Sequence, residues 1–225
     1  ALKIWQDAPV TLLREHYRCH PKIINFCNQK FYGGKLIVMT EDHEEPDVLT
    51  MIQTAPGNHA RGHLNQREID VIRAEVPPRL RDKGYESVGI ITPYKDQVAA
   101  IQQQLGGLEV ATVHKFQGRE KDAIVLTSVD NVIGEFVDDP RMLNVAVSRA
   151  VKSLTVVTSQ APRNDGTNYG DLARYIQYNN CAVVESAVYS VFDLLYQGYG
   201  QQRREFLQKH RRISEYDSEN LLYTV

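Results

Sequence analysis

The block His16-Tyr17-Arg18-Cys19-His20-Pro21 places an aromatic ring and a guanidinium directly before a predicted helix. An aromatic ring at such a junction can stack on a nucleobase, and a guanidinium can form paired hydrogen bonds with phosphate oxygens. The block therefore predicts a nucleotide contact by Tyr17 and Arg18. The same spacing also fits a half-buried tyrosine and a surface arginine at the start of a helix, so this block alone leaves both readings open.

The same block invites a metal interpretation, because His16, Cys19, His20 and the nearby Cys27 all carry suitable donor atoms. Their spacing lacks the paired Cys-x-x-Cys pattern of a structural zinc site. Cys27 also falls on the apolar face of the predicted helix, where a free cysteine behaves as a small hydrophobic residue. We therefore predict no metal site in this chain.

A second block, VGIITPYKDQ at residues 88–97, joins a buried strand to a helix through Thr92-Pro93-Tyr94. Hydroxyl groups and free backbone N–H groups at a helix start can hold phosphates, including those of a bound nucleic-acid strand. The alternative is a plain strand–turn–helix connection with a proline in its first turn.

A third block, VATVHKFQGREKD at residues 110–122, lies between two buried strands. Thr112 and His114 come at the end of the first strand, and a turn then presents Gly118 and Glu120. A glycine allows the backbone to approach a ligand closely, and a glutamate can accept hydrogen bonds from a ribose. This many polar groups between buried strands favours a binding function, with His114 as an orienting partner.

A fourth block, LNVAVSRA at residues 143–150, is apolar apart from Arg149 and is predicted to belong to a helix over 141–151. A guanidinium in a well-packed helix needs a negative partner, because a desolvated and unpaired charge is costly. That partner is either a carboxylate within the fold or a phosphate that arrives from outside.

Strands and helices alternate between about residues 21 and 185, and they must position these four blocks. Helices are predicted at residues 21–32, 65–76, 93–105 and 141–151, and strands at 48–52, 87–92, 110–113, 123–129 and 154–158. Pro77-Pro78 is predicted to break the second helix. Such alternation implies an α/β fold with a parallel sheet covered by helices on both faces. Ligands collect at the carboxyl ends of such strands, where we expect Thr92, residues 112–120 and the loop leading to Arg149 to lie.

The chain of 225 residues is long enough for one α/β domain with an appendage. We expect residues 1–185 to form that domain, and residues 186–225 to form a helical extension or the start of a further domain. Because the chain begins with Ala1 rather than Met, we expect it to be a piece of a longer polypeptide.

Composition is ordinary, with 42% hydrophobic and 24% charged residues and a net charge of −2. Any nucleic-acid binding must therefore come from a local surface. The three cysteines form no disulfide framework, which favours an intracellular location, cytoplasmic or, in a eukaryote, nuclear. No apolar run approaches the length of a membrane span, so no membrane partner is expected.

Together and in this order, the blocks resemble the C-terminal motifs of superfamily 1 helicases. The similar branch is the one that contains the nonsense-mediated-decay RNA helicase and the immunoglobulin switch-region DNA helicase. The resemblance spans roughly residues 11–180, and that branch typically has Gln where this chain has His16 and Met where it has Cys19. It is carried by His16–Pro21, Phe31–Gly34, Thr92–Tyr94, Phe116–Asp122, Asn144–Ala146 and Ser148–Ala150.

The resemblance implies a RecA-like lobe of the P-loop NTPase type. In such a lobe, Tyr17 would stack on the adenine of ATP and Arg18 would contact the γ-phosphate. Gly118 and Glu120 would serve the γ-phosphate region and the ribose, and Arg149 would be the arginine finger.

The resemblance also implies contacts with single-stranded nucleic acid by Thr92, Tyr94, Thr112 and His114, and movement in the 5′-to-3′ direction. The residues leave DNA and RNA both open, since a few contacts to the 2′-hydroxyl make that distinction.

The chain contains no Gly-x4-Gly-Lys-Ser/Thr motif, and Gly33-Gly34-Lys35 is too short to replace it. No Asp-Glu pair ends a buried strand in a position to hold Mg²⁺. We therefore expect an N-terminal RecA-like lobe of the same polypeptide to supply the phosphate cradle and the Mg²⁺ ligands. The fragment alone is expected to be inactive.

Two other functions compete with a helicase lobe. One is a catalytically silent, helicase-derived binding or scaffolding module. The other is a metal-dependent nuclease that uses acids such as Glu109 and Asp122, which lack a ligand cluster around them.

Overall fold

The computed structural model describes residues 13–55, 59–81, 83–159, 166–179 and 181–189, together with residues 199 and 202. The chain divides into two units, Ala1–Val188 and Tyr189–Val225, and every helix and strand given below belongs to the first. Most of the helical extension predicted for residues 186–225 lies outside the described residues.

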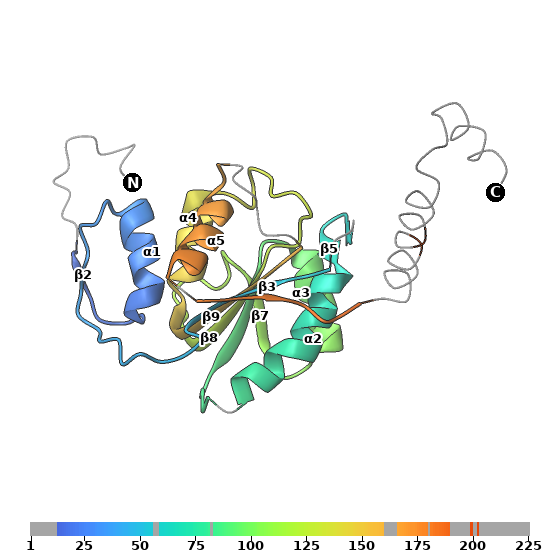
Figure 1. The fold of residues 1–225 in the computed structure, drawn as a ribbon, viewed down its shortest axis with the longest axis horizontal. Helices are drawn as coiled ribbons and strands as arrows, with labels where there is room; N and C mark the ends of the chain where they lie inside the picture. The colour runs from blue at the N-terminus through green and yellow to red at the C-terminus, as the bar shows by residue number, and fades with distance from the viewer. Residues whose placement is uncertain are drawn as a thin grey trace. The chain divides into compact units, whose positions relative to one another are not determined.

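A parallel sheet of six strands forms the centre of the first unit (Figure 1). Its strands, in spatial order, are β10 (Ala182–Glu185), β3 (Leu49–Gln53), β9 (Ala150–Thr158), β8 (Lys121–Thr127), β6 (Val88–Thr92) and β7 (Glu109–Thr112). Every neighbouring pair runs parallel. The runs of β-branched residues in β6, β8 and β9 are buried on both faces, as strands between two helical layers must be.

Two short strand pairs lie outside this sheet. β1 (Glu15–His16) pairs in parallel with β2 (Ile37–Val38), and β4 (Ala60–Arg61) forms a tight hairpin with β5 (Leu64–Asn65). The tip of the hairpin is Gly62-His63, where Gly62 has a φ of +59°.

Helices cover both faces of the sheet, which confirms the predicted α/β fold (Figure 1). α1 (Pro21–Phe31), α4 (Pro140–Val147) and α5 (Asn168–Tyr178) share one hydrophobic core, and α2 (Gln66–Arg81) and α3 (Lys95–Gln104) share the other. Neighbouring strand residues face opposite cores: Met51 belongs to the first and Ile52 to the second. None of the described helices combines the length and apolar character needed to cross a membrane.

The start of α1 follows the prediction, because Pro21 occupies its first turn and His20 is its N-cap. The Nδ1 atom of His20 accepts the backbone N–H of Lys22 at 3.1 Å. At the other end, Gly33 and Gly34 adopt positive φ angles of 59° and 73° and terminate the helix.

The predicted break at Pro77-Pro78 is wrong, because α2 continues through both prolines to Arg81. A proline inside a helix costs about 3 kcal/mol, since its ring crowds the preceding turn and one hydrogen bond is lost. Both rings lie on the exposed side, where the carbonyl groups they leave unpaired can bind water. The opposite side buries Ile72 and Val76 against the sheet, which keeps the helix intact.

The predicted helix over 141–151 is too long at its carboxyl end. α4 ends at Val147, and β9 begins at Ala150 rather than at residue 154. The competing interaction is strand pairing: the N–H of Lys121 donates to the carbonyl of Arg149 at 3.1 Å, and Ala150 lies opposite Lys121 in the sheet. Arg149 therefore lies in the turn between α4 and β9.

A buried carboxylate fixes the turn that follows β8. Glu68 of α2 is fully buried and accepts hydrogen bonds from the hydroxyl groups of Thr127 (2.6 Å) and Ser128 (2.9 Å). It also accepts the backbone N–H of Val129 at 2.9 Å. Val129 has a φ of +66°, a strained angle for a β-branched residue, which this network must hold in place.

Burial raises the pKa of the Glu68 carboxyl from 4.5 to about 7, although its hydrogen bonds act in the opposite direction. Between these two values the folded protein holds a proton that the unfolded chain has released. The stability that comes from this group is therefore present below pH 4.5 and lost as the pH rises towards 7.

We predict that Glu68→Gln, which imitates the protonated carboxyl, removes this pH dependence. Relative to the variant, the wild-type chain should lose about 3 kcal/mol of unfolding free energy across that window, because each pKa unit corresponds to about 1.4 kcal/mol. Urea unfolding at a series of pH values measures the difference. Glu86→Gln, at an exposed position, is the matched control, and parallel curves for the wild type and Glu68→Gln would contradict the prediction.

Candidate functional site

Arg18, Glu120 and Arg149 come from distant parts of the sequence and meet at one edge of the sheet. Glu120 directly precedes β8 and Arg149 directly precedes β9, and the two strands are parallel neighbours. Arg18 lies in the segment between β1 and α1. This edge is formed by the amino ends of β8 and β9, so the expectation of carboxyl ends is wrong for Glu120 and Arg149. It is confirmed for Thr92 and Thr112, which end β6 and β7.

The guanidinium of Arg18 is half-buried and makes two contacts. Its Nη1 atom lies 3.2 Å from Oε2 of Glu120, and its Nη2 atom donates to the carbonyl of Ser148 at 2.7 Å. Its Nε atom is buried without a hydrogen-bond partner in the described part of the chain. Because the protein covers this atom, it can reach a ligand only when the residues around it move.

The guanidinium of Arg149 has fewer partners. Its Nη1 atom donates weakly to the carbonyl of Arg119 at 3.4 Å, and none of the described carboxylates forms an ion pair with it. Its buried Nε atom also lacks a partner among those residues. Burial and the neighbouring charge of Arg18 lower the pKa of Arg149. Two like charges thus share one acidic neighbour, an arrangement suited to an incoming anion.

Tyr17 stands beside Arg18 with 65% of its surface exposed, and its hydroxyl donates to the carboxylate of Glu15. The ring is therefore tethered at one end and accessible elsewhere. His16 closes the turn that carries both residues, because its Nε2 atom accepts the backbone N–H of Cys19 at 2.9 Å. Burial, together with the charge of Arg18, lowers the pKa of His16, which keeps the imidazole neutral and able to accept.

The loop between β7 and β8 carries Gly118 and Glu120, both exposed. Gly118 has a φ of +84°, which favours glycine at this position. The loop is anchored by Phe116, whose side chain is fully buried against Gly89 of β6. A methyl group at residue 89 would lie 2.6 Å from Cζ of Phe116, so the ring occupies the space that glycine leaves.

The four residues predicted to contact nucleic acid lie towards the opposite edge of the sheet. Thr92 and Thr112 end β6 and β7 and are buried, with 0% and 7% of their surfaces exposed. The hydroxyl of Thr92 has no hydrogen-bond partner in the described part of the chain. His114 is exposed and lines a pocket of about 440 Å³. Tyr94 is partly buried, and its hydroxyl donates to Asp130 at 2.9 Å.

The sequence interpretation missed two residues that contact Tyr94. The imidazole of His63, on the β4–β5 hairpin, stacks on its ring at a centroid distance of 4.2 Å. The ring of Phe136, from the segment between β8 and α4, stacks at 5.5 Å. No spacing rule joins these three residues, because their contact depends on the packing of three separate loops.

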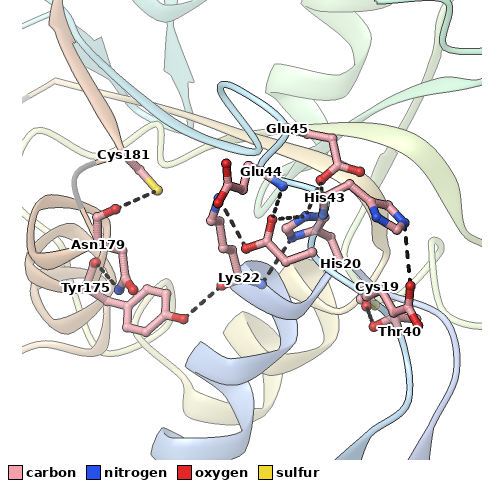
Figure 2. A network of polar contacts seen from close by, with 12 residues as sticks. Cys19, His20, Lys22, Thr40, His43, Glu44, Glu45, Tyr175, Asn179 and Cys181 are labelled. Carbon is pink, nitrogen blue, oxygen red and sulfur yellow. Dashed lines mark hydrogen bonds and ion pairs between the residues drawn. The ribbon is translucent and has the colours of Figure 1, made fainter.

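One group of metal-binding side chains occurs in the described residues: His20, Asp42 and Glu45. The Nε2 atom of His20 lies 3.1 Å from Glu45, and both residues are labelled in Figure 2. The same atom lies 3.4 Å from Asp42, which also pairs with Lys22. Since Nδ1 of His20 accepts the N–H of Lys22, the neutral ring carries its proton on Nε2, where a metal would have to bind. This geometry fits a helix cap and an ion pair better than a metal site.

Cys19 of the first block and Cys27 of α1 are part of the hydrophobic core. Cys19 and Cys27 are fully buried within the core under α1, and the thiol of Cys19 donates to the carbonyl of Ser148 at 3.3 Å. This contact links the Arg18 turn to the end of α4.

Comparison with known proteins supports a family assignment. Residues 2–161, more than half of the chain, match the family described as AAA domain. The 5′-3′ DNA helicase ZGRF1 of Mus musculus is 32% identical over 66% of this chain and 9% of its own length. The ATP-dependent helicase upf1 of Schizosaccharomyces pombe is 34% identical over 69% and 20%, and the regulator of nonsense transcripts 1 homolog of Drosophila melanogaster is 33% identical over 64% and 15%.

This chain therefore spans only about a tenth to a fifth of these relatives. Among solved structures, the C-terminal domain of a possible DNA helicase from Lactobacillus plantarum superposes with a TM-score of 0.51 at 15% identity. The match covers 74% of this chain and 98% of that domain. At such low identity the likeness concerns the fold alone.

We predict that Gly89→Ala displaces Phe116 and destabilises the chain by about 1–3 kcal/mol, the usual cost of overfilling a packed core. Urea unfolding measures the effect. The matched control is Gly106→Ala, since a methyl group at residue 106 meets nothing within 4 Å. Equal stabilities for the two variants would show that the Phe116 contact does not anchor the loop.

Proposed function

We propose that this chain completes an ATP site with an arginine finger. The chain belongs to the AAA domain family, and it is a C-terminal lobe of the superfamily 1 helicase type. We further propose that it contacts a single nucleic-acid strand at its other edge. The full enzyme would be an ATP-dependent helicase or translocase, with the ATP held between this lobe and an N-terminal RecA-like lobe of the same polypeptide.

The observation that carries the proposal is the pair of guanidiniums, Arg18 and Arg149, held together with Glu120 as their nearest acid. Holding two positive groups together costs free energy unless an anion joins them. Their Nε atoms are buried and lack partners in the described residues, so they can reach phosphate oxygens only when the residues around them move.

Glu120 does not stand in the way of such a ligand. The side chains of Arg18 and Glu120 are 34% and 55% exposed, and ion pairs this open to water contribute about 0–1 kcal/mol. Arg18 can therefore exchange Glu120 for a phosphate at little cost. Glu120 is then free to accept a hydrogen bond from the ribose, the role proposed for it.

Arg149 is proposed to stabilise the charge that develops on the transferring phosphoryl group. Its turn is fixed on both sides, by the end of α4 and by the first pairing of β9 with β8, so the guanidinium is placed before ATP arrives. Arg18, in the segment between β1 and α1, would contact the γ-phosphate. Tyr17, with its exposed ring, would stack on the adenine, and Gly118 would allow the loop backbone to approach the phosphates.

The described residues around these arginines do not fit a Mg²⁺ site, because they offer one carboxylate, and it faces Arg18. The Mg²⁺ ligands, the phosphate cradle and the water-activating carboxylate are therefore assigned to the other lobe. The Mg²⁺ bound there would neutralise phosphate charge. We expect this chain alone neither to hydrolyse ATP nor to unwind a duplex, and turnover by the pure chain would contradict that expectation.

The nucleic-acid strand is proposed to run along the carboxyl ends of β6 and β7, past Tyr94 and His114. Thr92 and Thr112 are buried there, so they would support this surface or become accessible when the lobes move. β6 and β8 connect the two edges, so closure of the lobes on ATP would shift the strand contacts and produce stepwise movement.

We predict that Arg149→Ala in the intact polypeptide lowers ATP hydrolysis about 10³- to 10⁵-fold, the usual contribution of an arginine finger. The lobe should stay folded, because this side chain makes a single weak hydrogen bond in the described structure. Steady-state phosphate release measures the effect, and thermal unfolding checks the fold.

Arg119→Ala is the matched control. Arg119 is a neighbouring arginine whose side chain pairs with Glu109 at the surface, and only its carbonyl contacts Arg149. Near-normal hydrolysis by Arg149→Ala, or equal losses in both variants, would contradict the arginine-finger assignment and favour the catalytically silent module.

A further inference from the structure

Three rings form a stack at the edge of the sheet opposite the two arginines. Tyr94 follows β6, and its ring is the one common to both contacts: His63 stacks on it almost parallel, at 5°, and Phe136 at 27°. Tyr94 is partly buried, whereas His63 and Phe136 have 63% of the side chain and 51% of the residue exposed, respectively. The central ring is thus largely covered, and the outer rings face solvent.

A hydrogen bond fixes the central ring of the stack, Tyr94. The hydroxyl of Tyr94 donates to Asp130, and burial followed by this hydrogen bond raises the pKa of Tyr94 to about 12. Asp130 follows Val129, whose backbone is fixed by the buried carboxylate of Glu68. The ring of Tyr94 is therefore positioned before any ligand binds, which reduces the entropy lost on binding.

The surroundings of the stack indicate what kind of ligand it suits. Phe136 also lines the 440 Å³ pocket, together with His114, Gln117 and Arg141. Acidic groups lie nearby as well: Asp96 is 3.9 Å from His63, and Glu135 and Asp139 border the pocket. Three carboxylates thus lie near one guanidinium, so a ligand would be held by its flat faces rather than by ionic attraction.

We propose that the outer faces of His63 and Phe136 are stacking platforms for bases of the single strand, with Tyr94 as the rigid centre of the platform. This proposal rests on the function proposed above and names where the strand is gripped. Base stacking on aromatic rings tolerates any sequence, because every base has a flat face. The proposal also changes the role expected for Tyr94, which was direct contact with the strand. Tyr94 would instead position the two outer rings.

The test uses His63→Ala and Phe136→Leu in the intact polypeptide, with binding of a fluorescent oligothymidylate measured by anisotropy. Each variant should weaken binding about 5- to 150-fold, the range for the loss of one stacked base. Leucine keeps the bulk of Phe136 but not its flat face. The loss should be similar at low and high salt, since stacking releases no counterions.

Tyr178→Ala is the matched control, because this tyrosine is 87% exposed at the end of α5 and forms no ring contact with the stack in the described structure. It should bind like the wild type. Phe136→Trp, which enlarges the flat face, should restore or improve the affinity lost in Phe136→Leu, and thermal unfolding of each variant checks that the fold is kept. A strand containing 5-iodouracil should cross-link to His63 or Phe136 on irradiation.

The outcomes separate this proposal from the one it rests on. If the wild type binds the strand and both ring variants bind equally well, the stacking platform is overturned while the helicase function stands. If the wild type binds no single strand, both are overturned. A loss in the ring variants that disappears at high salt would assign the effect to charge and also reject stacking.

Discussion

The register between β8 and β9 is the constraint on which the proposed ATP site depends. Because Lys121 and Ala150 lie opposite each other where these parallel strands begin, the residues just before them, Glu120 and Arg149, are adjacent. Arg18 joins them through the carbonyl of Ser148. A shift of one residue in this pairing would turn the carboxylate and the guanidinium away from each other. The buried strands that form the core thus also set the geometry of the surface group.

The sequence predicted the layered α/β fold and most of its elements, because their signals are local. Pro21 with the pair Gly33-Gly34 bounds α1, and unbroken runs of β-branched residues mark β6 and β8. It failed where tertiary contacts overrule local preference. Pro77 and Pro78 stay within α2 because the other side of that helix is buried, and α4 ends early because strand pairing takes residues 150–153.

For the candidate site, the residue types of Arg18, Glu120 and Arg149 predict contacts with a nucleotide, which stay a prediction. Which edge of the sheet they occupy followed only from the paths of the loops. The positions of His63 and Phe136 beside Tyr94 had no signal in the sequence. A stack built from three loops can be found only once the loops are placed.

The packing of the Phe116 ring against Gly89 couples two distant parts of the lobe. The ring ties the loop of Gly118 and Glu120 to the first half of β6, and the same strand ends next to Tyr94. The loop and β6 should therefore move together, and they connect the two edges of the sheet. A displacement of the loop would therefore be passed by the buried ring to β6, the strand that ends next to Tyr94.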